Sequence, residues 1–65
     1  MFYQKVKALC DERGMTIQKL EQTAGIGNGT IGKLKDGGYP KLTTVEKVAK
    51  ALEIDANILL KAIME

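Results

Sequence analysis

Small and polar side chains occupy one face of the segment that follows Gly25. If a helix begins near residue 28, that face carries Asn28, Gly29, Thr30 and Lys33. Amide, hydroxyl and ammonium groups supply hydrogen-bond donors and acceptors, and a glycine lets a partner approach the backbone closely. The chemistry that these residue types support is non-covalent recognition, in which no bond is made or broken.

The elements around this segment predict a known motif. The stretch from Thr16 to Asp36 reads as two short helices joined by a tight turn at Gly25, because glycine adopts a positive φ at little cost. Ile31 and Leu34 anchor the second helix from the face opposite to the polar side chains. This layout is typical of a helix-turn-helix, in which the first helix braces the second inside the major groove of DNA. The motif therefore predicts a DNA-binding protein.

Three glycines, Gly27, Gly29 and Gly32, lie in or beside the second helix of the motif. An interior glycine costs about 1 kcal/mol relative to alanine, so a sequence selected only for helix stability would avoid them. Close approach of the backbone to a partner is a physical reason to accept that cost.

Hydrophobic spacing predicts an all-α fold of five short helices in a single domain, residues 1–65. Helices are expected from about Phe2 to Arg13, after the N-cap Thr16, over about 28–36, from a capping box at Thr43 and Glu46, and after the cap Asp55. Their inward faces are expected to carry Phe2, Val6, Leu9, Cys10, Ile17, Leu20, Ala24, Ile31, Leu34, Val45, Val48, Ala49, Leu52, Ile58, Leu59, Ala62 and Ile63.

The remaining chemistry-bearing residues are not arranged for catalysis or metal binding. Asp11 and Glu12 lie on different helix faces, and the chain has no His and no metal-ligand spacing. The single Cys10 predicts a small buried hydrophobe in a reducing, cytoplasmic setting, with a redox role as the alternative. No run approaches the roughly 20 apolar residues of a membrane span. We therefore expect no enzyme, no cofactor and no small-molecule ligand.

Positive charge is concentrated around the motif. The net charge is only +2, but residues 16–41 carry +2, residues 1–15 carry +1 and residues 42–65 carry −1. Phosphate contacts are therefore expected from Gln18, Lys19, Lys35, Tyr39 and Lys41, supported by backbone amides at the start of the second and third helices. The alternatives are ordinary surface lysines, and a Tyr39 ring packed on the core edge under Pro40.

Both flanks of the motif resemble one family. The run KALCDERGMT is similar to K-x-L-x-x-E/D-R-G-M-T, and YPKLTTVEKVAKALEI is similar to P-x-L-x-T-L-x-K-I-A-x-A-L-x-V. Gly25 falls at the turn glycine, and Ile31 and Leu34 fall at the buried positions of the recognition helix. Over nearly its whole length the chain resembles the lambda-repressor-like (Cro and repressor, or Xre) family of phage and bacterial regulators.

The resemblance implies a sequence-specific transcriptional regulator, a phage-type repressor or Cro-like protein, that binds double-stranded DNA. Carried over by position, Asn28, Gly29, Thr30 and Lys33 would contact bases: Asn suits adenine, Thr the thymine methyl group and Lys guanine. The alternatives are a helix cap for Asn28, a solvated Thr30, and a solvated or phosphate-directed Lys33. The chain would be either a complete small Cro-like protein or the DNA-binding half of a longer repressor.

The chain departs from the family pattern at two positions. The position where the two motif helices nearly touch, usually Ala, is Glu21, whose carboxylate is expected to bend out to solvent or pair locally. The position where many members carry a phosphate-clamping Gln is Ile17, and Gln18 follows it. The phosphate contacts at the start of this helix therefore depend on whether Gln18 takes over that role.

The C-terminal helix has more apolar residues than one face needs. Leu60, Ile63 and Met64 are therefore predicted to form a weak homodimer contact that becomes cooperative on DNA, with scattered surface hydrophobes as the alternative. The alternative function is a protein-interaction module on the same fold, such as an antitoxin-like or antirepressor subunit.

Overall fold

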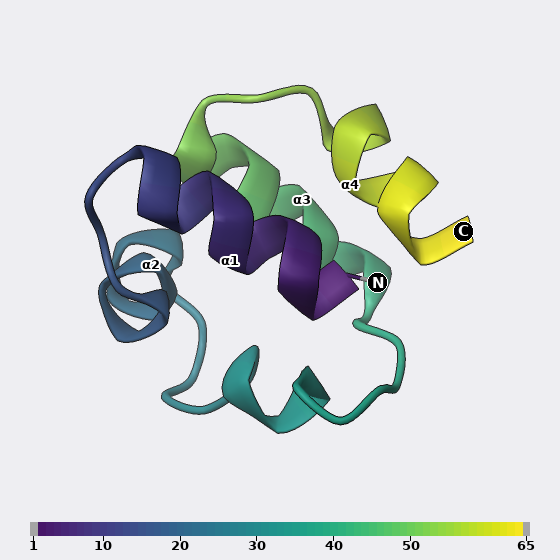
Figure 1. Cartoon of the computed structure of the whole chain (residues 1–65), viewed down its shortest axis with the longest axis horizontal. Coiled ribbons are helices and arrows are strands. Elements are labelled where there is room, and N and C mark those ends of the chain that lie inside the picture. Colours follow the sequence, from purple (N-terminus) through teal and green to yellow (C-terminus); the bar gives the residue numbers. More distant parts are fainter. Residues whose placement is uncertain (1, 65) are drawn as a thin grey trace.

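Four α-helices and one short 3₁₀ helix form the computed structural model, which describes residues 2–64 (Figure 1). The α-helices are α1 (Phe2–Glu12), α2 (Ile17–Ala24), α3 (Leu42–Leu52) and α4 (Ala56–Met64), and the 3₁₀ helix is η1 (Gly32–Leu34). No strand occurs within residues 2–64, which confirms the all-α prediction. The predicted count of five α-helices is wrong, because the third predicted helix is not an α-helix.

Local signals set the ends of α2 as predicted. The hydroxyl of Thr16 accepts a hydrogen bond from the backbone N–H of Lys19 at 3.0 Å, which satisfies one of the free donors at the start of the helix. Gly25 ends the helix with φ 73°, a conformation that favours glycine, and its N–H bonds back to the last turn. The chain leaves α2 at this turn toward the polar segment.

The capping box predicted at Thr43 is wrong. Helix α3 begins at Leu42 and its N-cap is Lys41, two residues before the predicted cap, and Lys41 makes no side-chain cap bond. Thr43 is thus already inside the helix, where its side chain cannot cap. At the other end, Glu53 closes α3 with φ 58°, the left-handed conformation that costs a non-glycine residue roughly 1–2 kcal/mol. Asp55 accepts the N–H of Asn57 at 2.9 Å, as expected of a residue that caps α4.

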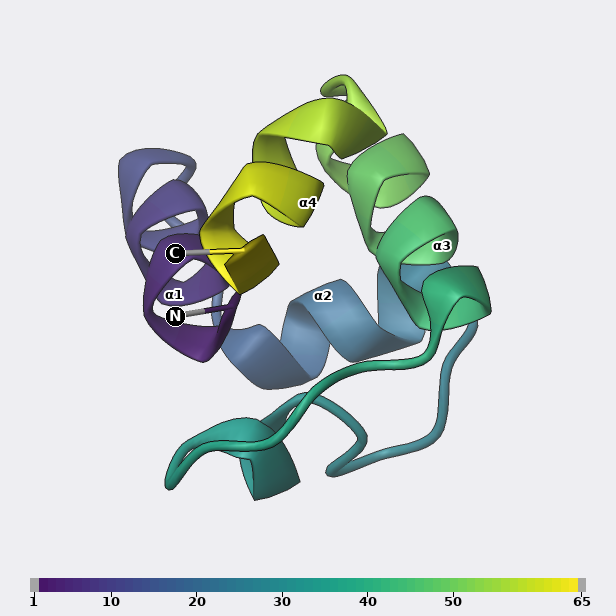
Figure 2. The ribbon, with the colours of Figure 1, turned by 90° about the vertical axis from the view of Figure 1, so that its right-hand side faces the viewer.

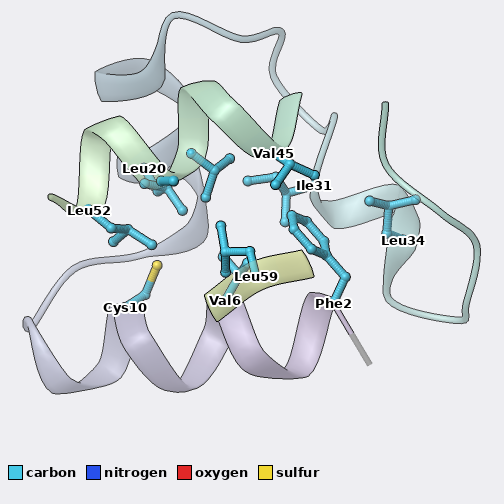
Figure 3. Packing of buried hydrophobic residues seen from close by; sticks show 11 residues of the cluster. Phe2, Val6, Cys10, Leu20, Ile31, Leu34, Val45, Leu52 and Leu59 are labelled. Atoms are coloured by element: carbon cyan, nitrogen blue, oxygen red, sulfur yellow. The ribbon is translucent and has the colours of Figure 1, made fainter. Parts of the chain in front are cut away.

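One hydrophobic cluster joins all five helical elements (Figure 3). Val6 and Cys10 of α1, Leu20 of α2, Val48 of α3 and Leu59 of α4 are completely buried. Helices α1 and α4, from opposite ends of the described chain, pack against each other (Figure 2). Helix α1 also contacts α2, and α4 also contacts α3. The predicted core is confirmed at Phe2, Val6, Cys10, Leu20, Ile31, Leu34, Val45, Val48, Ala49, Leu52, Leu59 and Ala62.

The predicted core is wrong at Ile58, which is 39% exposed, and Leu9, Ile17, Ala24 and Ile63 are only half-buried. None of the helices within residues 2–64 has the length and apolar content needed to cross a membrane.

Candidate nucleic-acid interface

The segment predicted as a recognition helix over about 28–36 is a series of turns followed by η1. Gly29 has φ 88°, which lies outside the right-handed helical region, so an α-helix cannot run through it. The N–H of Thr30 bonds to the carbonyl of Gly27 at 3.1 Å, and that of Lys33 to the carbonyl of Gly29 at 3.0 Å. The prediction of an α-helix here is wrong. The part of this segment that ends with η1, residues 28–34, is called the reading segment below.

Two apolar anchors hold the reading segment against the body of the domain, as predicted. Ile31 is fully buried and Leu34 is 8% exposed. Figure 3 shows Ile31 beside Val45 of α3, and Leu34 at the edge of the cluster. These anchors leave the intervening residues on the opposite, outer side.

Of the residues predicted to contact bases, Thr30 and Lys33 line one groove, whereas Asn28 and Gly29 do not. Asn28, Gly29 and Lys33 are exposed. Thr30 is half-buried, and its hydroxyl lies so close to Gly27 that a Cβ added there would be 3.2 Å from it. The side chains of Asn28 and Lys33 are therefore the most accessible of the set.

A groove of about 450 Å³ runs between the reading segment and the start of α3. Three lysines line it, Lys33 on one side and Lys41 and Lys47 on the other, and the lining contains no carboxylate. Positive charge with no opposing acid attracts anions such as phosphate. Thr43, Thr44 and Tyr39 complete the wall from the α3 side.

Of the predicted phosphate contacts, the groove brings together Tyr39 and Lys41. Gln18, Lys19 and Lys35 are exposed outside it, the first two on the first turn of α2. Tyr39 is 80% exposed, so the alternative that its ring packs on the core edge is wrong. Lys47, which was not predicted, also lines the groove, and its spacing of four residues from Thr43 places both on one face of α3.

Glu21 does not turn outward: of its two expected arrangements, the solvated carboxylate is wrong, and the carboxylate is paired inside the motif. Its side chain is only 3% exposed. Oε1 accepts the N–H of Gly29 at 3.0 Å, and Oε2 accepts the N–H of Ile31 at 2.8 Å and that of Gly32 at 3.4 Å. These three amides are bonded to the Glu21 carboxylate and are not available to DNA phosphate. Phosphate contacts had been expected from backbone amides at the start of the third predicted helix.

A family model for the Cro/C1-type HTH DNA-binding domain matches residues 5–63. The chain belongs to the Cro/C1-type helix-turn-helix family. The resemblance seen in the sequence is thereby confirmed.

Two curated relatives come from Bacillus subtilis (strain 168). The chain is 34% identical to the HTH-type transcriptional repressor RghR over 55 residues, and this aligned region covers 82% of this chain and 41% of RghR. It is 33% identical over 63 residues to the uncharacterized HTH-type transcriptional regulator RghRB, which covers 94% of this chain and 45% of that protein. The Cro/C1-type domain thus spans less than half the length of these relatives. No solved structure matches the chain.

Cys10 lies inside this Cro/C1-type domain as a buried hydrophobe. Burial raises the pKa of its thiol, and the neighbouring Asp11 carboxylate raises it further. A raised pKa keeps the sulfur protonated at neutral pH, where it is a poor nucleophile. Within residues 2–64 no three potential ligands gather into a metal site.

The predicted dimer contact on α4 is only partly open. Leu60 and Ile63 are half-buried and pack on the edge of the core cluster, whereas Met64 is 86% exposed. The exposed large apolar side chains of α4 are therefore those of Ile58 and Met64.

Proposed function

We propose that this Cro/C1-type domain binds double-stranded DNA in a sequence-specific manner and regulates transcription, as a phage-type repressor or Cro-like regulator. The observation that carries the proposal is the groove lined by Lys33, Lys41 and Lys47 without a carboxylate. The exposed Asn28 follows Gly27 of the groove wall in the sequence. Support for a regulatory role comes from the relatives, one of which is named a transcriptional repressor.

In this proposal the reading segment enters the major groove. Asn28 and Lys33 reach base edges, Asn suiting adenine and Lys suiting guanine, while Gly29 lets the DNA approach the backbone. Thr30 adds its methyl group from a half-buried position. Base contacts of this kind carry the sequence preference.

Phosphate contacts hold the domain in register on both sides of the reading segment. Lys41 and Lys47 flank it across the groove, with Tyr39 between the reading segment and α3. Gln18 and Lys19 reach DNA phosphates from the start of α2, and Lys35 reaches them from the end of η1. Glu21 occupies the amides of Gly29, Ile31 and Gly32, so the backbone contacts to phosphate in this proposal come from the start of α2 alone.

Salt dependence tests whether DNA is the partner. If about four lysines meet phosphates, a plot of log affinity against log salt should have a slope of roughly −3 to −4 per subunit. Lys41→Gln should reduce that slope by about 1, because one fewer counterion is released. The measurement is fluorescence anisotropy on duplex DNA between low and moderate salt.

Lys5→Gln is the matched control, since Lys5 is an exposed lysine on α1 and the loss of charge is the same. It should leave the slope unchanged. A salt-independent affinity, or no binding at low salt, would contradict the DNA proposal and favour the protein-interaction module.

We also propose that two copies bind DNA together through α4, with Leu60, Ile63 and Met64 at the contact. One reading segment covers only a few base pairs, and a two-fold dimer on half-sites about 34–36 Å apart doubles that number. Because Leu60 and Ile63 also pack on the core, the contact that remains is small and the free protein should be largely monomeric at micromolar concentration.

Met64→Lys should abolish cooperative loading on paired half-sites while single half-site affinity is kept. Asn57→Lys adds the same charge at another exposed position of α4 and should leave cooperativity intact. Footprinting and sedimentation measure the two quantities. Non-cooperative binding in the unchanged protein, with no response to Met64→Lys, would eliminate this interface.

A further inference from the structure

Glu21 is a charged side chain in the interior of a very small domain. Burying a carboxylate is costly unless hydrogen bonds replace the water that it loses. Here the carboxylate has three backbone N–H donors, and within residues 2–64 no buried side-chain oxygen lacks a partner. All three donors belong to the reading segment, eight to eleven residues further along the chain.

We infer that Glu21 is a positioning residue for DNA recognition: its carboxylate fixes the backbone of the reading segment and so aims the side chains that contact bases. This inference rests on the proposed function. Glu21 itself is buried and touches no DNA in this arrangement.

The reading segment needs an external brace because its own structure is weak. It contains Gly29 in the left-handed region and Gly32, and glycine loses more backbone freedom on ordering than any other residue. Its only regular element is one turn of 3₁₀ helix, whose hydrogen bonds have poor geometry. Ile31 and Leu34 fix where the segment sits, but both point inward and leave the outer residues free to rotate with the backbone.

The carboxylate supplies what this backbone lacks. The N–H groups at the start of a helical turn have no partner within the turn, and a negative charge there is favourable. Oε1 holds Gly29, just after Asn28, and Oε2 holds Ile31 and Gly32, just before Lys33. Asn28 and Lys33, the two exposed side chains proposed to contact bases, are thus each next to a residue whose backbone N–H binds Glu21.

Glu21→Gln is the sharpest test, because the change keeps the shape of the side chain. One of the two oxygens becomes an NH₂ donor, and that donor must face a backbone N–H donor. The variant therefore loses at least one charge-assisted bond and creates one repulsive contact. Glu12→Gln is the control: Glu12 is an exposed carboxylate on α1, outside the helix-turn-helix, and the change in net charge is identical.

The first readout is amide hydrogen exchange without DNA, followed by NMR. In the unchanged protein the amides of Gly29, Ile31 and Gly32 should be protected. In Glu21→Gln their exchange should accelerate at least roughly ten-fold, which is what loss of a bond to a charged group produces. The amide of Val48, in the middle of α3, should accelerate much less, and Glu12→Gln should change neither.

The second readout is DNA affinity, on a selected site and on random duplex. Glu21→Gln should weaken binding to the selected site roughly ten- to a hundred-fold and leave binding to random duplex unchanged or slightly tighter, since one negative charge is lost. A residue that only stabilised the fold would, in protein that is still folded, leave the ratio of the two affinities as it was.

The outcomes separate the possibilities. Unchanged exchange in the reading segment, or an unchanged affinity ratio in a folded Glu21→Gln, overturns the inference. If Glu21→Gln does not fold, the unchanged protein decides, because exchange at the Ile31 amide as fast as in an unstructured chain overturns it and slow exchange supports it. If the unchanged protein binds no DNA, the proposed function falls instead, and the exchange data still report whether Glu21 orders the segment.

Discussion

Replacing Leu20 with Ala is expected to remove about 2–4 kcal/mol of the free energy of unfolding. Leu20 is fully buried in the hydrophobic cluster described in residues 2–64, so its truncation leaves a cavity that neighbours from several helices would have to fill. A core of this size gives only about 3–5 kcal/mol in total. The variant should therefore be partly unfolded at room temperature. Denaturation by urea, followed by circular dichroism, measures the loss.

Leu42→Ala is the matched control for this experiment. The same atoms are removed, but Leu42 is 63% exposed at the start of α3. Its midpoint should shift little, because a surface substitution of this kind usually changes stability by no more than about 0.5 kcal/mol. Equal midpoints for the two variants would show that Leu20 is not in the core.

The second large effect is expected on DNA. Asn28→Ala or Lys33→Ala should cost about 1–3 kcal/mol on the preferred site and flatten the base preference, because each removes a group proposed to bond to a base edge. Thr30→Ala is a less direct test, since Thr30 is half-buried against Gly27. Selection from a randomised duplex pool, followed by affinity measurement, would show the preference of each variant.

Lys41→Ala separates base reading from phosphate binding. Lys41 lies across the groove from Lys33 and is proposed to hold phosphate, so its loss should weaken all sequences evenly. If Asn28→Ala and Lys33→Ala keep the base preference of the unchanged protein, the reading segment has been wrongly assigned.

The sequence predicted best those features whose causes are local. Thr16 and Gly25 set the ends of α2 through bonds to residues within one turn, and Asp55 does the same for α4. The buried faces of α1 and α3 followed from helical spacing, because a stripe at that period has only one way to face a core. The family followed from motif and flanks together.

The features that the sequence did not predict depend on groups far apart in the chain. Glu21 was expected in solvent or paired locally, and its burial was not predicted because its partners are backbone amides, which no residue type indicates. Gly29 was counted as an interior helix residue, whereas its positive φ interrupts the helix. At Thr43 the sequence pattern of a cap is present, but the helix has already begun at Leu42, so the Thr43 side chain is not at the helix end.

The packing of α1 against α4 has a consequence for the order in which the protein is made. The helix-turn-helix consists of contacts between near neighbours in sequence, which form quickly, whereas the core closes only when Leu59 of α4 joins Val6 of α1 and Ile31. A nascent chain that has emerged as far as the reading segment therefore has the residues proposed to face DNA but not the core that supports them. We expect DNA binding to be acquired only once α4 has left the ribosome, and not gradually as the motif appears.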